Sequence, residues 1–452
     1  MGQTVLARRS LQSRAIVALT ASIAALGGLL FGYNISVISG AMPYLRRDFH
    51  LSDTQVEFAV GILLAGALAG SAVAGYAADR WGRRTVLLWT ALGFTAFAAL
   101  TGLSSGIRSL AASRFLLGCC IGIVSLLSPL YLAEVSPTRH RGALVSCNQL
   151  AITAGILLAY LVDYVFAASG NWRGMFVSAI VPAVGLMAGM FFLPETPRWL
   201  ARQGCRQRAL ESLQRLGRGD EADAELNEVE GALQKEREGI GMLSQRGFRR
   251  AVLIGVSLAI IQSISGIDTI IFYAPEVLTR SGYSSTRAAI MATVVIGIVN
   301  VAVTVLSMLL IDRMGRRFLL LLSSAGMAVM LGFVGLAFHR HSTGLTVFYE
   351  LVGAVVFFGV GLGPVMWLLI SEIYPTKIRG KAMSLATLSN WGADWLITGT
   401  FLSLVHWAGP AGTFWIYGVI CAAAFAFSYA MVPETKGKSL EAIERYWSKL
   451  DE

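Results

Sequence analysis

Charged side chains are scarce in this chain. Asp, Glu, Lys and Arg make up 14% of its 452 residues, whereas a soluble globular domain carries about 25%. Prolines number only 11 against 48 glycines, so the composition is not that of a proline-rich disordered chain. The shortage of charge argues against an ordinary soluble enzyme.

Cysteines are also few. There are five, an odd number without a repeated spacing, and four of them fall in apolar stretches: Cys119, Cys120, Cys147, Cys205 and Cys421. Neither a disulfide framework nor a zinc site is indicated by such a pattern. We therefore expect no metal and read these cysteines as small packing residues.

Hydrophobic residues are abundant in their place. They make up 55% of the chain, and the mean hydropathy is +0.63. Twelve membrane-spanning helices would occupy about 240–300 residues, which leaves room for short loops and one larger polar segment. The composition predicts an all-α membrane protein with many spans.

Twelve apolar stretches are long enough to span a bilayer. They lie at 15–44, 54–78, 85–103, 109–134, 142–166, 173–193, 248–281, 285–311, 317–338, 344–372, 379–406 and 412–432. The first is longer than a secretory signal, so we expect it to be retained. The boundaries predict an N-terminal six-helix half (1–193), a cytoplasmic helical linker (194–247), a C-terminal six-helix half (248–432) and a cytoplasmic tail (433–452).

The basic residues orient these spans. With the N-terminus in the cytoplasm, fourteen Lys and Arg fall in the inner short loops and seven in the outer ones, as the positive-inside rule requires. We expect both termini in the cytoplasm and a multi-pass protein of a cell membrane, the inner membrane if the source is bacterial. The net charge of +10 is then an insertion signal, and no nucleic-acid partner is expected.

Three short motifs occur twice, in the same order. Asp79–Arg84 returns as Asp312–Arg317, Glu134 with Arg141–Gly142 returns as Glu372 with Arg379–Gly380, and Pro194–Thr196 returns as Pro433–Thr435. Six spans per half give both halves the same orientation, so the repeats are parallel and related by an axis along the membrane normal. A central cavity that opens alternately to each side suits this architecture.

The motif charges sit at cytoplasmic helix ends, where carboxylates and guanidiniums can pair across helices. We expect them to form an inner gate, closed when the cavity faces outward and broken when it faces inward; a static topological anchor is the alternative. The gate residues are Asp79, Arg83, Glu134, Arg141, Glu195, Asp312, Arg316, Glu372, Arg379 and Glu434.

Over essentially its whole length the sequence resembles the sugar porter family of the major facilitator superfamily. The resemblance rests on the doubled Asp-Arg-x-Gly-Arg-Arg, on Pro194–Trp199 and Pro433–Gly437, and on Gln262 with Ser265–Gly266 and Gly363–Pro364 with Trp367. It implies transport of a monosaccharide or polyol by alternating access, without a cofactor. A functional monomer in the lipid bilayer is expected.

Polar side chains inside the spans are functional candidates because each is costly unless it has a partner. Amides match the neighbouring hydroxyls of a sugar, and an indole can cover its apolar face. The resemblance and the chemistry together predict a substrate site. Its residues are Gln149, Gln262, Ser263, Asp268, Asn300, Trp367, Asn390 and Trp391.

Coupling to protons remains open between two readings. Proton-coupled members of the family usually carry an Asp on the first helix, where this chain has Asn34, and this favours a facilitative uniporter. Asp268 and Asp394, however, replace usual Asn residues, and a buried carboxylate is poised for proton exchange. We expect Asp268 to carry the proton in a symporter, with Asp394, Arg114 and Asn34 as further coupling candidates.

Other function classes fit less well. Val432 stands where the leading glycine of a phosphate-binding loop ending at Gly437–Ser439 is needed, so an ATP-driven pump is not indicated. The five histidines lie in loops or at span ends and form no catalytic or metal set, so we expect no enzyme. A proton-coupled exchanger of organic cations or drugs and a sugar sensor remain as alternatives.

Overall fold

The computed structural model describes residues 2–136, 141–218, 221–238, 246–374, 379–438, 443, 446 and 447. These residues form helices and no strand, which confirms the predicted all-α class. The helices are α1 (Gly2–Phe49), α2 (Asp53–Trp81), α3 (Arg83–Gly102), α4 (Ile107–Val135), α5 (Arg141–Ala167), α6 (Trp172–Val177), α7 (Ile180–Phe192), α8 (Pro197–Arg202), α9 (Arg206–Arg215), α10 (Ala222–Glu238), α11 (Arg246–Ile264), α12 (Ile267–Arg280), α13 (Thr286–Met314), α14 (Arg316–His339), α15 (Gly344–Val360), α16 (Pro364–Ile373), α17 (Arg379–Thr398) and α18 (Phe401–Met431).

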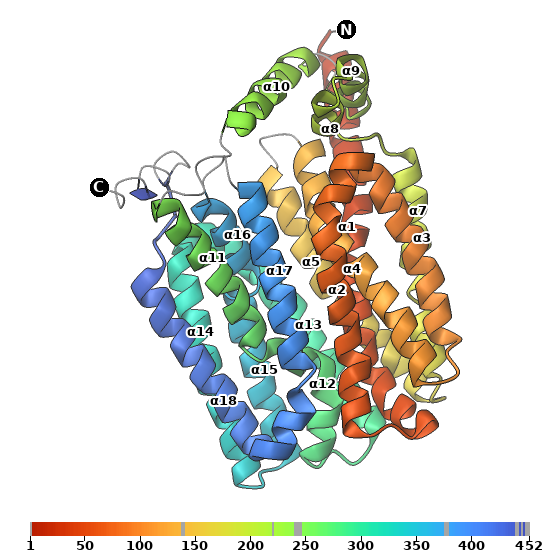
Figure 1. The fold of residues 1–452 in the computed structure, drawn as a ribbon, viewed down its shortest axis with the longest axis vertical. Helices are drawn as coiled ribbons and strands as arrows, with labels where there is room; N and C mark the ends of the chain where they lie inside the picture. Colours follow the sequence, from red (N-terminus) through yellow and green to blue (C-terminus); the bar gives the residue numbers. More distant parts are fainter. Residues whose placement is uncertain are drawn as a thin grey trace.

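Two groups of long helices stand side by side (Figure 1). Helices α1–α7 form the N-terminal half and α11–α18 form the C-terminal half, with α8–α10 at one end of the bundle. We call the end nearest α8–α10 the inner end and the opposite end the outer end. Paired motifs therefore occupy corresponding positions in the two halves, since each lies where its span meets the inner end.

Eleven segments of the described chain are long and apolar enough to span a membrane, whereas the sequence predicts twelve. The difference lies at α17 and α18. Helix α17 carries Asn390 and Asp394, which make it too polar to count by composition. Helix α18 contains a break at Gly409, which directly precedes Pro410. The φ angle of Gly409 is 72°, in the left-handed region. The predicted span 379–406 thus consists of the polar helix α17, which ends at Thr398, and the first residues of α18.

Glycines allow the helices of a half to pack closely. A Cβ atom at Gly118 of α4 would lie 2.0 Å from the carbonyl oxygen of Leu63 in α2, and one at Gly66 of α2 would lie 2.1 Å from that of Phe115 in α4. Only glycine fits at these two positions. This is the small-residue packing that membrane helices use where lipid removes the hydrophobic driving force.

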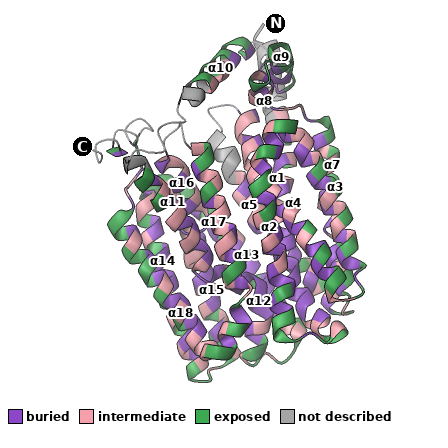
Figure 2. Cartoon of the chain, viewed as in Figure 1, coloured by how far each residue is buried: buried purple, intermediate pink, exposed green. Residues whose placement is uncertain are grey.

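Apolar side chains cover the outside of the bundle, where exposed residues gather in Figure 2. Phe192 is 81% exposed, Val181 is 76% exposed and Trp89 is 68% exposed. A surface this apolar along long helices is expected for a protein surrounded by lipid. The core lies between the helices, where Tyr33, Tyr160 and many leucines are fully buried.

The linker helices α8–α10 pack against the N-terminal half. Trp199 donates its indole N–H to the carbonyl oxygen of Asp79 at 2.9 Å, and the Ser212 hydroxyl donates to that of Glu195 at 2.6 Å. A small apolar cluster holds the three helices together; it comprises Leu200, Ala209, Leu213, Ala222 and Leu226. The segment is therefore attached to one half.

Candidate substrate site and gates

Two spans of the C-terminal half are interrupted near their middle. Gly266, with φ 87°, separates α11 from α12, and a Cβ there would lie 2.6 Å from the ring of Tyr417. Helices α15 and α16 are separated by Gly361–Gly363 before Pro364. Interrupted helices leave backbone groups without helical partners, so polar side chains gather there. The Gln262 amide donates to the exposed carbonyl oxygen of Leu362 at 2.8 Å and thereby links the two breaks.

Gln262, Ser263 and Asn390 form a hydrogen-bonded cluster. The Asn390 amide nitrogen lies 3.2 Å from Gln262 Oε1, 2.7 Å from Ser263 Oγ and 2.9 Å from the carbonyl oxygen of Ala259. The Ser263 hydroxyl donates to the Asn390 carbonyl oxygen at 3.0 Å. Three of the expected substrate residues thus meet, and their donors and acceptors match the hydroxyl pairs of a sugar.

Trp391 extends this cluster towards the other half. Its side chain is buried, and its ring lies 5.4 Å from that of Phe31 in α1, measured between centroids. Aromatic pairs at this separation stabilise contacts between helices. An indole beside the amide cluster has the chemistry to cover the apolar face of a ring.

The other expected substrate residues lie on separate helices. Asn300 of α13 is buried near Gly359 of α15, while Gln149 of α5 and Trp367 of α16 are half-buried. In the described part of the chain, the side chains of Gln149 and Trp367 make no hydrogen bond to the amide cluster. Their place in a substrate site stays a prediction.

The two intramembrane aspartates lie on neighbouring helices, α12 and α17. Asp268 is half-buried in the first turn of α12, where the helix dipole favours a negative charge. Asp394 is buried in α17, and its Oδ1 accepts a hydrogen bond from the Thr398 hydroxyl at 2.9 Å.

Arg114 pairs with neither aspartate. Its guanidinium is fully buried; Nε donates to the carbonyl oxygen of Ala59 at 2.8 Å, and the group lies 5.6 Å from the ring centroid of Phe176. The Asn34 amide turns back to the carbonyl oxygen of Leu30 at 2.8 Å. The idea that Arg114 compensates one of the intramembrane carboxylates is therefore not supported by its contacts.

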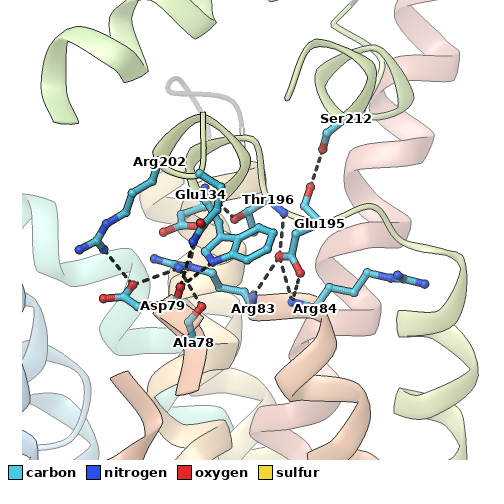
Figure 3. A network of polar contacts seen from close by, with 11 residues as sticks. Ala78, Asp79, Arg83, Arg84, Glu134, Glu195, Thr196, Arg202 and Ser212 are labelled. Carbon is cyan, nitrogen blue, oxygen red and sulfur yellow. Dashed lines mark hydrogen bonds and ion pairs between the residues drawn. The ribbon is translucent and has the colours of Figure 1, made fainter. Parts of the chain in front are cut away.

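The inner motifs of the N-terminal half form a dense network (Figure 3). Arg83 bridges Asp79 at 3.2 Å and Glu134 at 3.1 Å, and both Arg83 and Glu134 are buried. The Glu195 carboxylate accepts the backbone N–H groups of Arg83 and Arg84 at 3.0 and 3.1 Å, at the start of α3. Glu195 therefore caps the N-terminus of α3. Its carboxylate accepts hydrogen bonds from otherwise unpaired backbone N–H groups, and its negative charge interacts favourably with the positive end of the helix dipole.

Burial raises the pKa of Glu195 above its usual value, while hydrogen bonds from the backbone amides of Thr196, Arg84 and Arg83 lower it. Desolvation is the larger of these effects. The residue therefore holds its charge at a cost, because water is replaced by a fixed set of amides.

The C-terminal half repeats the arrangement. Arg316 bridges Asp312 at 3.1 Å and Glu372 at 3.2 Å, and Glu434 accepts the backbone N–H groups of Arg316 and Arg317 at 3.1 and 3.2 Å. The repeated motifs thus make the same bonds twice, each within its own half. Arg379 donates to the carbonyl oxygen of Tyr374, and the side chain of Arg141 lies outside the described residues. An inner gate that pairs the halves stays a prediction.

At the outer end, bonds do join the two halves. Arg46 of α1 lies 2.8 Å from Asp53 and 3.8 Å from Glu276 of α12, and Arg280 lies 3.0 Å from Glu276 and 3.9 Å from Asp53. We name these four residues the outer quartet. The Tyr160 hydroxyl also donates to the carbonyl oxygen of Ile271 at 3.0 Å. The outer side of the bundle is closed by these contacts.

Two carboxylates that the sequence analysis passed over have notable positions. Glu57 of α2 accepts the backbone N–H and the hydroxyl of Ser403, each at 2.6 Å, across the halves. Asp163 of α5 is fully buried against α1. Both stand inside stretches predicted to span the membrane, and an acidic residue in such a stretch is the signal that marks them.

Comparisons with known proteins agree with this architecture. The family model described as "Sugar (and other) transporter" matches residues 20–447. The "Probable metabolite transport protein CsbC" of Bacillus subtilis is 40% identical, over 93% of this chain and 92% of that protein. The "Galactose-proton symporter" of Escherichia coli is 37% identical, over 94% of this chain and 92% of its own length.

A solved structure of the proton:xylose symporter XylE bound to 6-bromo-6-deoxy-D-glucose superimposes with a TM-score of 0.83 at 33% identity, covering 96% of this chain and all of that one. The inward-open conformation of the Escherichia coli xylose transporter XylE also gives 0.83, at 32% identity and over 95% of this chain. The family model, the relatives and the solved structures each cover almost the whole chain. The chain belongs to the sugar porter family of the major facilitator superfamily and is a membrane transporter.

Proposed function

We propose that this protein carries a monosaccharide or polyol across a cell membrane together with a proton, by alternating access. The observation that carries the substrate class is the cluster of Gln262, Ser263 and Asn390 beside Trp391, which offers paired donors and acceptors next to an aromatic face. Relatives named as galactose- and arabinose-proton symporters support the same class. The inner end faces the cytoplasm, both termini lie there, and the protein acts as a monomer.

Asp268 carries the proton in this proposal. It stands in the first turn of α12, two residues after the break at Gly266, and is half-buried on a helix that packs against α17, which carries Asp394. A carboxyl group at membrane depth that is not fully buried can exchange a proton with a solvent-filled cavity. Asp394 is the partner that tunes Asp268, because Thr398 already holds its Oδ1.

A facilitative uniporter is the second candidate, and Asn34 favours it. The Asn34 amide does not titrate and is bonded to its own helix. In a uniporter, Asp268 would only accept hydrogen bonds from the sugar, and the sugar gradient alone would drive transport.

Uptake by transport-deficient cells separates these candidates. Labelled glucose, galactose, xylose and inositol are supplied, each with and without a protonophore. Symport predicts accumulation that collapses with the protonophore. In that case D268N should abolish accumulation while sparing sugar exchange; accumulation that survives D268N would refute the proton role of Asp268. Equilibration that ignores the protonophore would establish the uniporter.

A further inference from the structure

Asp163 is a carboxyl group sealed inside the N-terminal half. It is 0% exposed where the outer part of α5 packs against α1. Its Oδ2 accepts the backbone N–H of Gly40 at 3.1 Å, whereas its Oδ1 is buried without a hydrogen-bond partner among the described residues. A Cβ atom at Gly40 would lie 2.4 Å from the Asp163 side chain. Glycine at this position of α1 therefore leaves the space that the Asp163 side chain occupies.

No cation compensates this carboxyl group among the described side chains. The titratable groups that face it are phenols, and the nearby arginines are engaged with tyrosine rings: Arg47 lies 5.9 Å from the ring centroid of Tyr44 on α1, and Arg287 of α13 lies 5.1 Å from that of Tyr164 on α5. The phenols that interact with Asp163 are Tyr33, Tyr44 and Tyr160. An isolated carboxylate in such a place costs several kcal/mol, so the closed form favours the neutral acid.

Two buried serines precede Gly40 on α1. The hydroxyl oxygens of Ser36 and Ser39 make no hydrogen bond in the described part of the chain. Ser39 adjoins Gly40, and Ser36 lies one helical turn before it on the same face. A neutral Asp163 can donate to such an oxygen, whereas the ionised form offers only acceptors.

Asp163 is buried next to contacts that join the two halves. Tyr160 lies one turn before Asp163 on α5, donates to the Ile271 carbonyl oxygen of α12, and packs against Gly297 of α13, where a Cβ would lie 3.0 Å from its ring. Separation of the halves at the outer end must break both contacts. Water then enters between α1 and α5. Hydration lowers the free-energy cost of the charged form of Asp163.

We propose that Asp163 is a second proton site of this transporter, and that the outer side closes only when Asp163 is protonated. This deepens the proposed symport by naming a residue that makes outer closure depend on an external proton. By linkage, the closed form binds more protons than the open form, so acid favours closure and alkali favours opening. One such site changes the open-to-closed ratio by up to about tenfold per pH unit.

The sign of this response sets Asp163 apart from the other outer carboxylates. Protonation of Glu57, Asp53 or Glu276 would remove a charge that now receives hydrogen bonds or an ion pair across the halves. Loss of any of these three charges would therefore weaken closure, whereas neutralisation of Asp163 would strengthen it. The direction of the pH response decides which of them controls the outer end.

The experiment measures the distance across the outer end without any sugar. Spin labels are placed at T54C and W407C, two exposed positions at the outer ends of α2 and α18, in a full-length protein whose five cysteines are replaced. Pulsed electron resonance in lipid nanodiscs then follows the distance from about pH 5 to about pH 9. We expect a short distance in acid and a growing longer population as the pH rises.

Three variants complete the test. D163N should hold the short distance at every pH, D163E should keep the pH response with a displaced midpoint, and E228Q, at an exposed position of α10, should respond as the parent protein does. A parent protein without a pH response, or one that opens in acid, would overturn the inference, and so would a D163N protein that still opens in alkali. If D163N fails to fold, the pH responses of the parent protein and of D163E still test the inference. Sugar uptake that does not depend on protons would contradict the proposed function. The distance between the labels tests only the role of Asp163.

Discussion

Glu57 of α2 caps the first turn of α18 from the opposite half of the molecule through Ser403. Ser403 is the third residue of α18, so its backbone N–H has no partner within that helix. The buried Glu57 carboxylate accepts this N–H and the Ser403 hydroxyl at 2.6 Å each. Charge-assisted hydrogen bonds at a helix N-terminus are among the stronger polar contacts. We call this pair the latch, because it joins the two halves at the outer end.

The E57Q variant tests the latch. Glutamine keeps the shape but removes the charge, which should weaken closure by about 1–2 kcal/mol and raise the open-to-closed ratio by about tenfold. The outer distance between labels at positions 54 and 407 reports the change. S403A removes only the hydroxyl and should have a smaller effect; an E57Q protein as closed as the parent would show that the latch does not control the outer end.

Neutralising the inner motif residues should shift the conformational balance. E134Q leaves the buried Arg83 with Asp79 as its remaining carboxylate, and breaking a buried pair costs about 3 kcal/mol. We expect E134Q and R379Q to lower the thermal stability and to change accessibility at the inner end. R202Q is the matched control, because its ion pair with Asp79 is half-exposed and contributes under about 1 kcal/mol. Unchanged transport and accessibility in E134Q and R379Q would contradict the gate.

Glu195 makes stability depend on pH. Its pKa in the folded protein is raised above the usual 4.5, so the folded state binds more protons than the unfolded state between the two values. Stability from this residue is therefore highest below about 4.5 and falls as the pH rises through the raised pKa. Thermal unfolding across this range should show a flatter profile for E195Q than for the parent. E228Q, on the exposed face of α10, should follow the parent; an E195Q profile as steep as the parent's would exclude this role.

The amide cluster should set the affinity for sugar. N390A removes the amide that contacts Gln262, Ser263 and Ala259, and the loss of such hydrogen bonds costs about 1–2 kcal/mol. We expect Kd for a transported sugar to rise by about tenfold, measured by binding to the purified protein. N227A, on α10 away from this cluster, is the control. Equal sugar affinity in N390A and the parent would place the site elsewhere.

The doubled motifs could be predicted from the sequence because they depend on local residues, and the amides of Gln262 and Asn390 stand out within apolar runs. Residues 248–281 and 344–372 are predicted as single spans, whereas the structure interrupts them at Gly266 and at Gly361–Gly363. Glu57 could not be paired in this way, since its partner Ser403 lies 346 residues along the chain. Asp163 stands inside the predicted span 142–166, four residues from the end of its helix, but its burial depends on the packing of α1 against α5, which local residues do not determine.

Proton-driven uptake into proteoliposomes tests the central claim most directly. The purified protein is reconstituted, an alkaline interior is imposed, and entry of labelled galactose or xylose is followed over time. Sugar–proton symport predicts an internal concentration that transiently exceeds the external one and loses this excess when a protonophore dissipates the gradient. An internal concentration that never exceeds the external one, with or without the protonophore, would contradict symport and leave a uniporter.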